Sequence, residues 1–145
     1  MAEALQADIV VVGAGTSGCY FAWRMCQAGY RVLVLEKQRL EDLGRSIGIF
    51  HMDEVRFDEF GLPHPAGPEL VGQYATGLAW SPDRQVQNEV RYAFYVMDKP
   101  AFQQRMAGYV RDAGGEILAE AEVVEPIVEN SSVVGVRARR NGGLL

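Results

Sequence analysis

The sequence predicts an α/β fold built on a parallel sheet, and two observations carry that prediction. First, Ile9–Val12 and Val32–Leu35 are short apolar runs, typical of strands that are buried on both faces. Second, the segment between them, Ser17–Ala28, has apolar residues on most sides, as expected of a buried helix. A strand, a helix and a second strand in this order form a βαβ unit, in which the two strands run parallel.

A glycine-rich turn, Gly13-Ala14-Gly15-Thr16-Ser17-Gly18, joins the first strand to the helix. Gly13 permits the tight turn, Gly15 lets the main chain approach a pyrophosphate, and Gly18 lets the helix pack closely against the sheet. The first N–H groups of the helix and its dipole then face the phosphates. Glu36 ends the second strand, where its carboxylate accepts hydrogen bonds from an adenosine ribose and repels the 2′-phosphate of NADP. This stretch therefore predicts a dinucleotide-binding, Rossmann-like unit.

The next segment is irregular. Residues 37–72 show no sustained periodicity, apart from a brief helix expected at 52–60 with Val55, Phe57 and Phe60 on its buried side. Long irregular segments in compact domains are usually functional, so we expect this one to lie over a ligand.

Two strands are then expected, Tyr74–Trp80 and Arg91–Met97, around the turn signal Ser81-Pro82-Asp83-Arg84. Both faces of the second strand are apolar, so the sequence predicts that it is covered on both sides. We treat residues 37–97 as an irregular insert within the domain.

The last third of the chain predicts a second helix followed by a β-meander. The helix begins near Asp98 or Lys99 and ends at Gly114-Gly115. Its apolar stripe consists of Phe102, Met106, Tyr109, Val110 and Ala113. The strands expected after it are Glu116–Ala121, Val123–Val128 and Val133–Arg139. We therefore expect one domain over residues 1–145, incomplete because a fold of this type has further strands.

Composition narrows the function classes. The chain has 145 residues and a net charge of −5 without a basic block, so no nucleic-acid partner is expected. Cys19 and Cys26 lie two turns apart on the first helix, too far for a disulfide, and no metal site is predicted. The start lacks the pattern of a signal peptide and no apolar run is long enough to span a membrane, so we expect a cytoplasmic protein.

Three later segments carry a resemblance to a known family. They are Ser81-Pro82-Asp83, Tyr95-Val96-Met97-Asp98-Lys99-Pro100-Ala101-Phe102, and Ala113-Gly114-Gly115-Glu116, followed by the closing Val133-Val134-Gly135-Val136. With the glycine turn, they resemble the FAD-binding start of the flavoproteins that include aromatic-ring hydroxylases and geranylgeranyl reductases, and the reductase branch in particular. The resemblance implies an FAD-dependent oxidoreductase that reduces an apolar or isoprenoid-like small molecule, with a membrane surface as a further possible partner.

The resemblance also extends the predicted cofactor site. The loop at Arg45 and Ser46 corresponds to the family's flavin-proximal loop, Lys99 stands where the family has an arginine, and the main chain at Val123 would touch the adenine. Together with the turn and the strand end, the candidate FAD-binding residues are Gly13, Gly15, Thr16, Ser17, Gly18, Glu36, Lys37, Arg45, Ser46, Lys99 and Val123. No catalytic residue is predicted, because the chain holds no nucleophile–base set or paired catalytic acids.

Two alternatives stay open at the sequence level. One is an NAD-binding dehydrogenase domain, although a simple NAD domain continues with regular βα units after the second strand. The other is a non-catalytic nucleotide-binding subunit of a split flavoprotein, which would complete its fold with a partner chain or a C-terminal domain.

Overall fold

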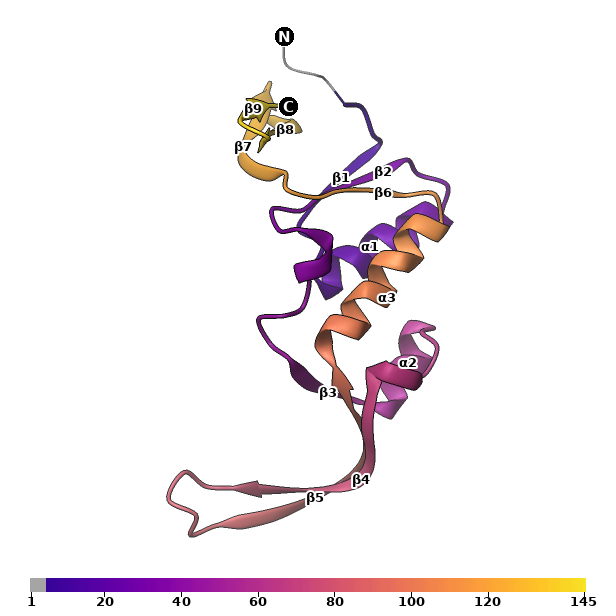
Figure 1. Cartoon of the computed structure of the whole chain (residues 1–145), viewed down its shortest axis with the longest axis vertical. Helices are drawn as coiled ribbons and strands as arrows, with labels where there is room; N and C mark the ends of the chain where they lie inside the picture. Colours follow the sequence, from indigo (N-terminus) through magenta and orange to yellow (C-terminus); the bar gives the residue numbers. More distant parts are fainter. Residues whose placement is uncertain (1–4) are drawn as a thin grey trace. The chain divides into compact units, whose positions relative to one another are not determined.

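The computed structural model describes residues 5–145 and divides them into two compact units (Figure 1). The parallel-sheet unit comprises residues 5–43 and 103–145, and the antiparallel unit comprises residues 44–102. The parallel-sheet unit contains β1 (Ile9–Val12), α1 (Thr16–Gln27), β2 (Val32–Leu35), the 3-10 turn η1 (Leu40–Asp42), β6 (Glu116–Leu118), β7 (Glu122–Glu129), β8 (Ser132–Arg140) and β9 (Gly143–Leu144). The antiparallel unit contains β3 (Ile49–Asp53), α2 (Glu54–Phe60), the 3-10 turn η2 (Gly67–Glu69), β4 (Leu70–Trp80) and β5 (Gln87–Asp98). Helix α3 (Lys99–Asp112) begins in the second unit and ends in the first.

The parallel sheet confirms the fold class predicted from the sequence. Its strand order is β1-β2-β6, with β1 and β6 each pairing parallel to β2. All four residues of the central strand β2 are buried, as its uninterrupted apolar sequence requires. This is the strand arrangement of one half of a Rossmann fold.

Helices α1 and α3 contact each other within this unit. Cys19 and Ala22 form the fully buried face of α1. The ring of Trp23 on α1 stacks on Tyr109 of α3, with a centroid distance of 5.1 Å. The helix α3 ends at Asp112, close to the predicted stop at Gly114-Gly115, and Gly114 has a positive φ of 87°.

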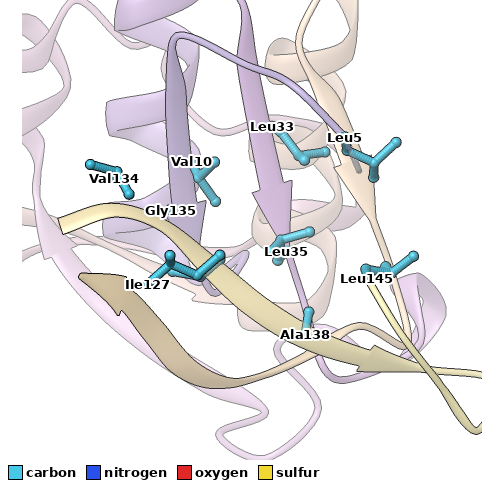
Figure 2. A pocket seen from close by; sticks show the side chains of 10 residues that line it. Leu5, Val10, Leu33, Leu35, Ile127, Val134, Gly135, Ala138 and Leu145 are labelled. Atoms are coloured by element: carbon cyan, nitrogen blue, oxygen red, sulfur yellow. The ribbon is translucent and has the colours of Figure 1, made fainter. Parts of the chain in front are cut away.

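A β-meander, β7-β8-β9, packs against the parallel sheet through a small apolar core. Leu33 and Leu35 of β2 contact Ala121 and Ala138 there. Leu33 and Leu35 also line a cavity together with meander residues such as Ile127 and Ala138 (Figure 2). The volume of this cavity is about 220 Å³. The two-residue strand β9, which pairs with the end of β8, was not predicted because two residues carry no periodicity.

The antiparallel unit is more regular than the sequence indicated. Strand β3 lies inside the segment expected to be irregular and pairs with β5, giving the order β3-β5-β4. The predicted brief helix is present as α2, but only Phe57 is buried on it. The expectation that Val55 and Phe60 share this buried side is wrong, since they are 52% and 45% exposed. With seven residues, α2 presents only about two turns to the sheet, enough for one buried side chain.

Strand β5 is covered over only part of its length, contrary to the prediction. Tyr95 and Met97 are buried, whereas Tyr92 is 37% exposed. The exposed part of β5 pairs with β4 alone, since β3 reaches β5 only from Phe94 onward. Among residues 5–145, no helix is long and apolar enough to cross a membrane.

Candidate dinucleotide-binding site

The glycine turn, residues 13–18, connects β1 to α1 and has the geometry that its spacing predicts. Gly13 has a φ of 94°, a conformation that favours glycine. A Cβ on Gly18 would lie 2.1 Å from the carbonyl oxygen of Gly13, so only glycine allows α1 to begin this close to the turn. A Cβ on Gly13 or Gly15 would meet nothing within 4 Å. The main chain at these two positions therefore borders open space that a ligand can enter.

Glu36 lies beside this turn and is 7% exposed. Its Oε2 accepts a hydrogen bond from the backbone N–H of Ala14 at 2.7 Å, and its Oε1 accepts one from the N–H of Gln38 at 2.8 Å. An ionised carboxylate offers about four acceptor positions, so two remain for other donors. The acid predicted to bind a ribose is thus held rigidly at the end of β2 and keeps the capacity for two hydroxyl groups.

A groove of about 320 Å³ opens at this end of the parallel strands. Its lining residues are Val12, Gly13, Leu35, Glu36, Lys37, Ala121, Glu122 and Val123. Four of the predicted cofactor-binding residues thus come together here: Gly13, Glu36, Lys37 and Val123. Ligands of open α/β sheets bind at the carboxyl ends of the strands, which is where this groove lies.

The residues present fit the adenosine and pyrophosphate end of a dinucleotide. The open main chain at Gly13 and Gly15 leaves room for phosphate oxygens, and α1 begins at Thr16, so the partial positive charge of a helix N-terminus lies beside these glycines. The carboxylates of Glu36 and Glu122 favour hydroxyl groups over a 2′-phosphate.

The remaining candidates, Arg45, Ser46 and Lys99, belong to the antiparallel unit and form a second group. The backbone N–H of Lys99 donates to the carbonyl of Gly48 at 2.6 Å, which ties the loop 44–48 to the start of α3. The Lys99 ammonium lies over the rings of Phe50 and Phe102, at 4.5 and 5.2 Å from their centroids. Arg45 and Ser46 are exposed on that loop.

Sequence reasoning missed one residue of the glycine turn's surroundings, Gln103 on α3. Its side chain is 2% exposed and bonds to the turn. The signal was available, because Gln103, Met106, Ala107 and Val110 follow the i, i+3, i+4, i+7 spacing of a buried helix face. A polar residue on such a face must have hydrogen-bond partners.

A second polar cluster, also unforeseen, lies in the antiparallel unit. His64 contacts Asp58 through Nε2 at 3.2 Å and the Tyr95 hydroxyl through Nδ1 at 2.9 Å, and that hydroxyl donates to Glu54 at 3.1 Å. Burial and the hydrogen bond to Glu54 raise the pKa of Tyr95 above its usual value. Over residues 5–145, no group of three or more His, Cys, Asp or Glu side chains is arranged to hold a metal ion.

Comparison with known proteins agrees with this geometry. Residues 11–67 match the family described as NAD(P)-binding Rossmann-like domain. The chain is 26% identical to the digeranylgeranylglycerophospholipid reductase of Sulfolobus acidocaldarius, over 90% of this chain and 29% of that protein. It is 29% identical to the thiamine thiazole synthase of Aeropyrum pernix, over 91% of this chain and 43% of that one.

Among solved structures, a geranylgeranyl bacteriochlorophyll reductase-like protein from Thermoplasma acidophilum superposes with a TM-score of 0.84. It shares 19% sequence identity over 95% of this chain and 36% of that one. The chain is thus similar in sequence to digeranylgeranylglycerophospholipid reductases and similar in fold to this geranylgeranyl bacteriochlorophyll reductase-like protein. A myxobacterial chondrochloren halogenase, described as a variant of FAD-dependent halogenases, has the same fold, with a TM-score of 0.75 and 21% identity over 96% of this chain and 34% of that one.

The chain spans about a third of the length of most curated relatives that it matches. The region of this chain that matches the NAD(P)-binding Rossmann-like domain family, residues 11–67, contains the glycine turn and Glu36.

Proposed function

We propose that this chain is the dinucleotide-binding portion of an FAD-dependent oxidoreductase and that it binds the adenosine diphosphate part of FAD. One observation carries the proposal: the glycine turn and the buried carboxylate of Glu36 converge on a single groove at the carboxyl ends of the parallel strands. FAD, when bound, supplies the hydride or electron transfer, and the protein supplies orientation and electrostatics.

In this proposal the candidate residues divide into three groups. The residues of the glycine turn (Gly13, Gly15, Thr16, Ser17 and Gly18) bind the pyrophosphate. Glu36 and Lys37 contact the ribose, and the main chain at Val123 contacts the adenine. Arg45, Ser46 and Lys99 act nearer the flavin. The domain proposed to hold them is the N-terminal part of an FAD-binding domain over 1–145, interrupted by the insert at 37–97.

FAD is preferred to NAD for two reasons. The chain does not continue with regular βα units after β2, since three antiparallel strands and α2 come before α3. In addition, structural relatives are described as FAD-dependent halogenases and monooxygenases. The alternative hypothesis is an NAD-binding dehydrogenase domain.

The test is a titration of the purified chain with FAD and NADH in parallel, each followed by ligand fluorescence. We expect FAD to bind and Glu36→Gln to weaken it by about tenfold, because ribose hydrogen bonds to a charged acceptor are lost. The matched control is Glu116→Gln, which neutralises an exposed acid at the opposite end of the parallel strands. Binding of NADH without FAD would favour the dehydrogenase alternative, and binding of neither would refute a dinucleotide site.

The substrate that we propose is apolar and isoprenoid-like. Support comes from the relatives named digeranylgeranylglycerophospholipid reductase. Further support comes from the antiparallel unit, where Tyr74, which is 51% exposed, stacks on Phe94 at a centroid distance of 5.6 Å beside the half-exposed Tyr92. An aromatic sheet surface of this kind suits a long apolar chain.

An assay for saturation of polyisoprenoid double bonds, with the reduced flavoprotein and a chemical reductant, tests this substrate class. Replacing Tyr92 and Tyr74 by serine should raise KM for the polyisoprenoid while FAD stays bound. A reduced flavoprotein that reacts with small polar acceptors and leaves polyisoprenoids unchanged would refute it. If the chain binds FAD but transfers no electrons without a second polypeptide, the split-flavoprotein subunit becomes the better description.

A further inference from the structure

Gln103 has the most buried polar side chain in the part of the chain that the structure describes, at 2% exposed. It is distant in sequence from the glycine turn, yet the hydrogen bonds of its amide go to that region. Nε2 donates to the carbonyl oxygen of Ala14 at 2.6 Å and lies 3.5 Å from Cys19 Sγ. Oε1 accepts from the Thr16 hydroxyl at 3.1 Å. Both ends of the amide are therefore committed to the same turn.

These bonds fix one particular peptide group. In a planar trans peptide the C=O and the following N–H point in opposite directions. Because Gln103 holds the Ala14 carbonyl, the N–H of Gly15 is turned away from Gln103. Glu36 holds the N–H of Ala14 on the other side of the same residue, at 2.7 Å. Ala14 is thus held at both of its backbone polar groups.

The orientation of the Gly15 N–H matters because the surroundings of Gly15 are open and are the predicted place of approach of the pyrophosphate. We infer that Gln103 is a positioning residue that sets the affinity for the dinucleotide pyrophosphate by fixing the Ala14–Gly15 peptide. The inference rests on the proposed FAD site and adds to it a determinant from α3 that does not touch the ligand.

The main test compares two glutamine replacements on the same helix. Gln103→Met keeps the length of the side chain but removes the bonds to Ala14 and Thr16. The matched control is Gln104→Met, since the Gln104 amide also donates to a backbone carbonyl, that of Leu40, which lies outside the turn. We expect the Kd for FAD to rise about tenfold in Gln103→Met and to change less than twofold in Gln104→Met, although both lose a hydrogen bond to a backbone carbonyl.

A ligand comparison separates positioning from a general loss of stability. The affinity for ADP, which carries the pyrophosphate, should fall in Gln103→Met as the FAD affinity does. The affinity for adenosine, which lacks it, should stay within twofold of the parent. A lower thermal stability of Gln103→Met with unchanged FAD affinity in the folded protein would overturn the inference.

Gln103→Glu gives an independent readout if the methionine variant does not fold. The introduced carboxyl group, when protonated, donates to the Ala14 carbonyl and accepts from Thr16, as the amide does, whereas its ionised form places a charged oxygen against that carbonyl. We expect the FAD affinity of Gln103→Glu to fall at least tenfold as the pH rises from 5 to 8, while that of the parent stays constant. If the FAD affinities of Gln103→Glu and of the parent change with pH in the same way, the inference is refuted. If the parent itself binds no FAD, the proposed function fails instead, and the two failures are distinguishable.

Discussion

Two glycines of the same turn should respond to alanine in different ways, Gly15 through the ligand and Gly18 through the fold. The Cβ of Gly15→Ala would meet no protein atom within 4 Å, and the backbone there is extended, with φ −70° and ψ 178°. The Cβ of Gly18→Ala would lie 2.1 Å from the carbonyl oxygen of Gly13 and 3.4 Å from a methyl group of Val11. The close neighbour is backbone, so α1 itself has to move.

The magnitudes follow from these distances. Overpacking of this kind costs about 1–3 kcal/mol in the free energy of unfolding. A chain of 145 residues has an unfolding entropy of about 0.3 kcal/mol/K, so Gly18→Ala should lower Tm by about 3–10 °C. Gly15→Ala should leave Tm unchanged or slightly raised, because alanine restricts the unfolded chain. Its Cβ occupies the predicted path of the pyrophosphate, and losing one charge-assisted backbone hydrogen bond should raise the Kd for FAD by about 10–100-fold.

Circular dichroism melts of the ligand-free proteins and FAD titrations of the same samples measure both effects. The expected pattern is a stable Gly15→Ala protein with weak FAD binding and a destabilised Gly18→Ala protein. An unchanged Tm for Gly18→Ala would refute the close approach of α1 to the turn. Parent-like FAD affinity in Gly15→Ala would refute the pyrophosphate site, whatever happens to Gly18→Ala.

Three further predictions concern stability. The pKa of Tyr95 is raised by burial and by Glu54, so the unfolded chain ionises first as the pH passes about 10, and the free energy of unfolding should fall above that pH. In urea titrations at pH 8, 10 and 11, the free energy of unfolding of Tyr95→Phe should fall less with pH than that of the parent. An equal fall in both proteins would contradict the raised pKa. Asp98→Ala should cost about 0.5–2 kcal/mol in the same urea assay, because Asp98 caps the first turn of α3, where its carboxylate accepts a backbone N–H at 2.8 Å. Leu35→Ala should cost about 2–5 kcal/mol by removing a side chain buried between the sheet and the meander, whereas Val133→Ala, at a 68% exposed position, should change stability by less than about 0.5 kcal/mol.

The parallel-sheet unit could be predicted because its signals are local. Continuous apolar runs specify β1 and β2, and a glycine after the periodic stripe specifies the end of α3. The antiparallel unit was predicted less well. Strand β3, with the sequence Ile-Phe-His-Met-Asp, shows no clear alternation and forms because β5 pairs with it from far along the chain. Such long-range pairing leaves little trace in a single sequence.

In the candidate site, too, the features set by local sequence could be predicted and those set by long-range contacts could not. The spacing of the glycines reports backbone requirements that are local to the turn, so Gly13 and Gly18 could be assigned roles that the observed φ and Cβ distances fit. The spacing on α3 could show that Gln103 is buried, but it could not show that Gln103 bonds to the turn, because Thr16 and Ala14 are 87 and 89 positions away. The same holds for His64, whose bond to Tyr95 spans 31 positions and joins the loop after α2 to β5.

Glu36 shows why a binding defect at this site needs more than one ligand to interpret. Its carboxylate accepts the N–H of Ala14 and the N–H of Gln38, so it supports the glycine turn before any ligand arrives. In Glu36→Gln one amide nitrogen faces a backbone donor, and the turn loses support in addition to the ribose contact. The two losses can be separated with inorganic pyrophosphate, which has no ribose. If Glu36→Gln loses affinity for inorganic pyrophosphate by nearly as much as it loses affinity for FAD, Glu36 acts mainly on the turn, in the same way as Gln103. If pyrophosphate binds as before, the ribose contact carries the effect, and the acid at the end of β2 has the role that its position in the sequence predicts.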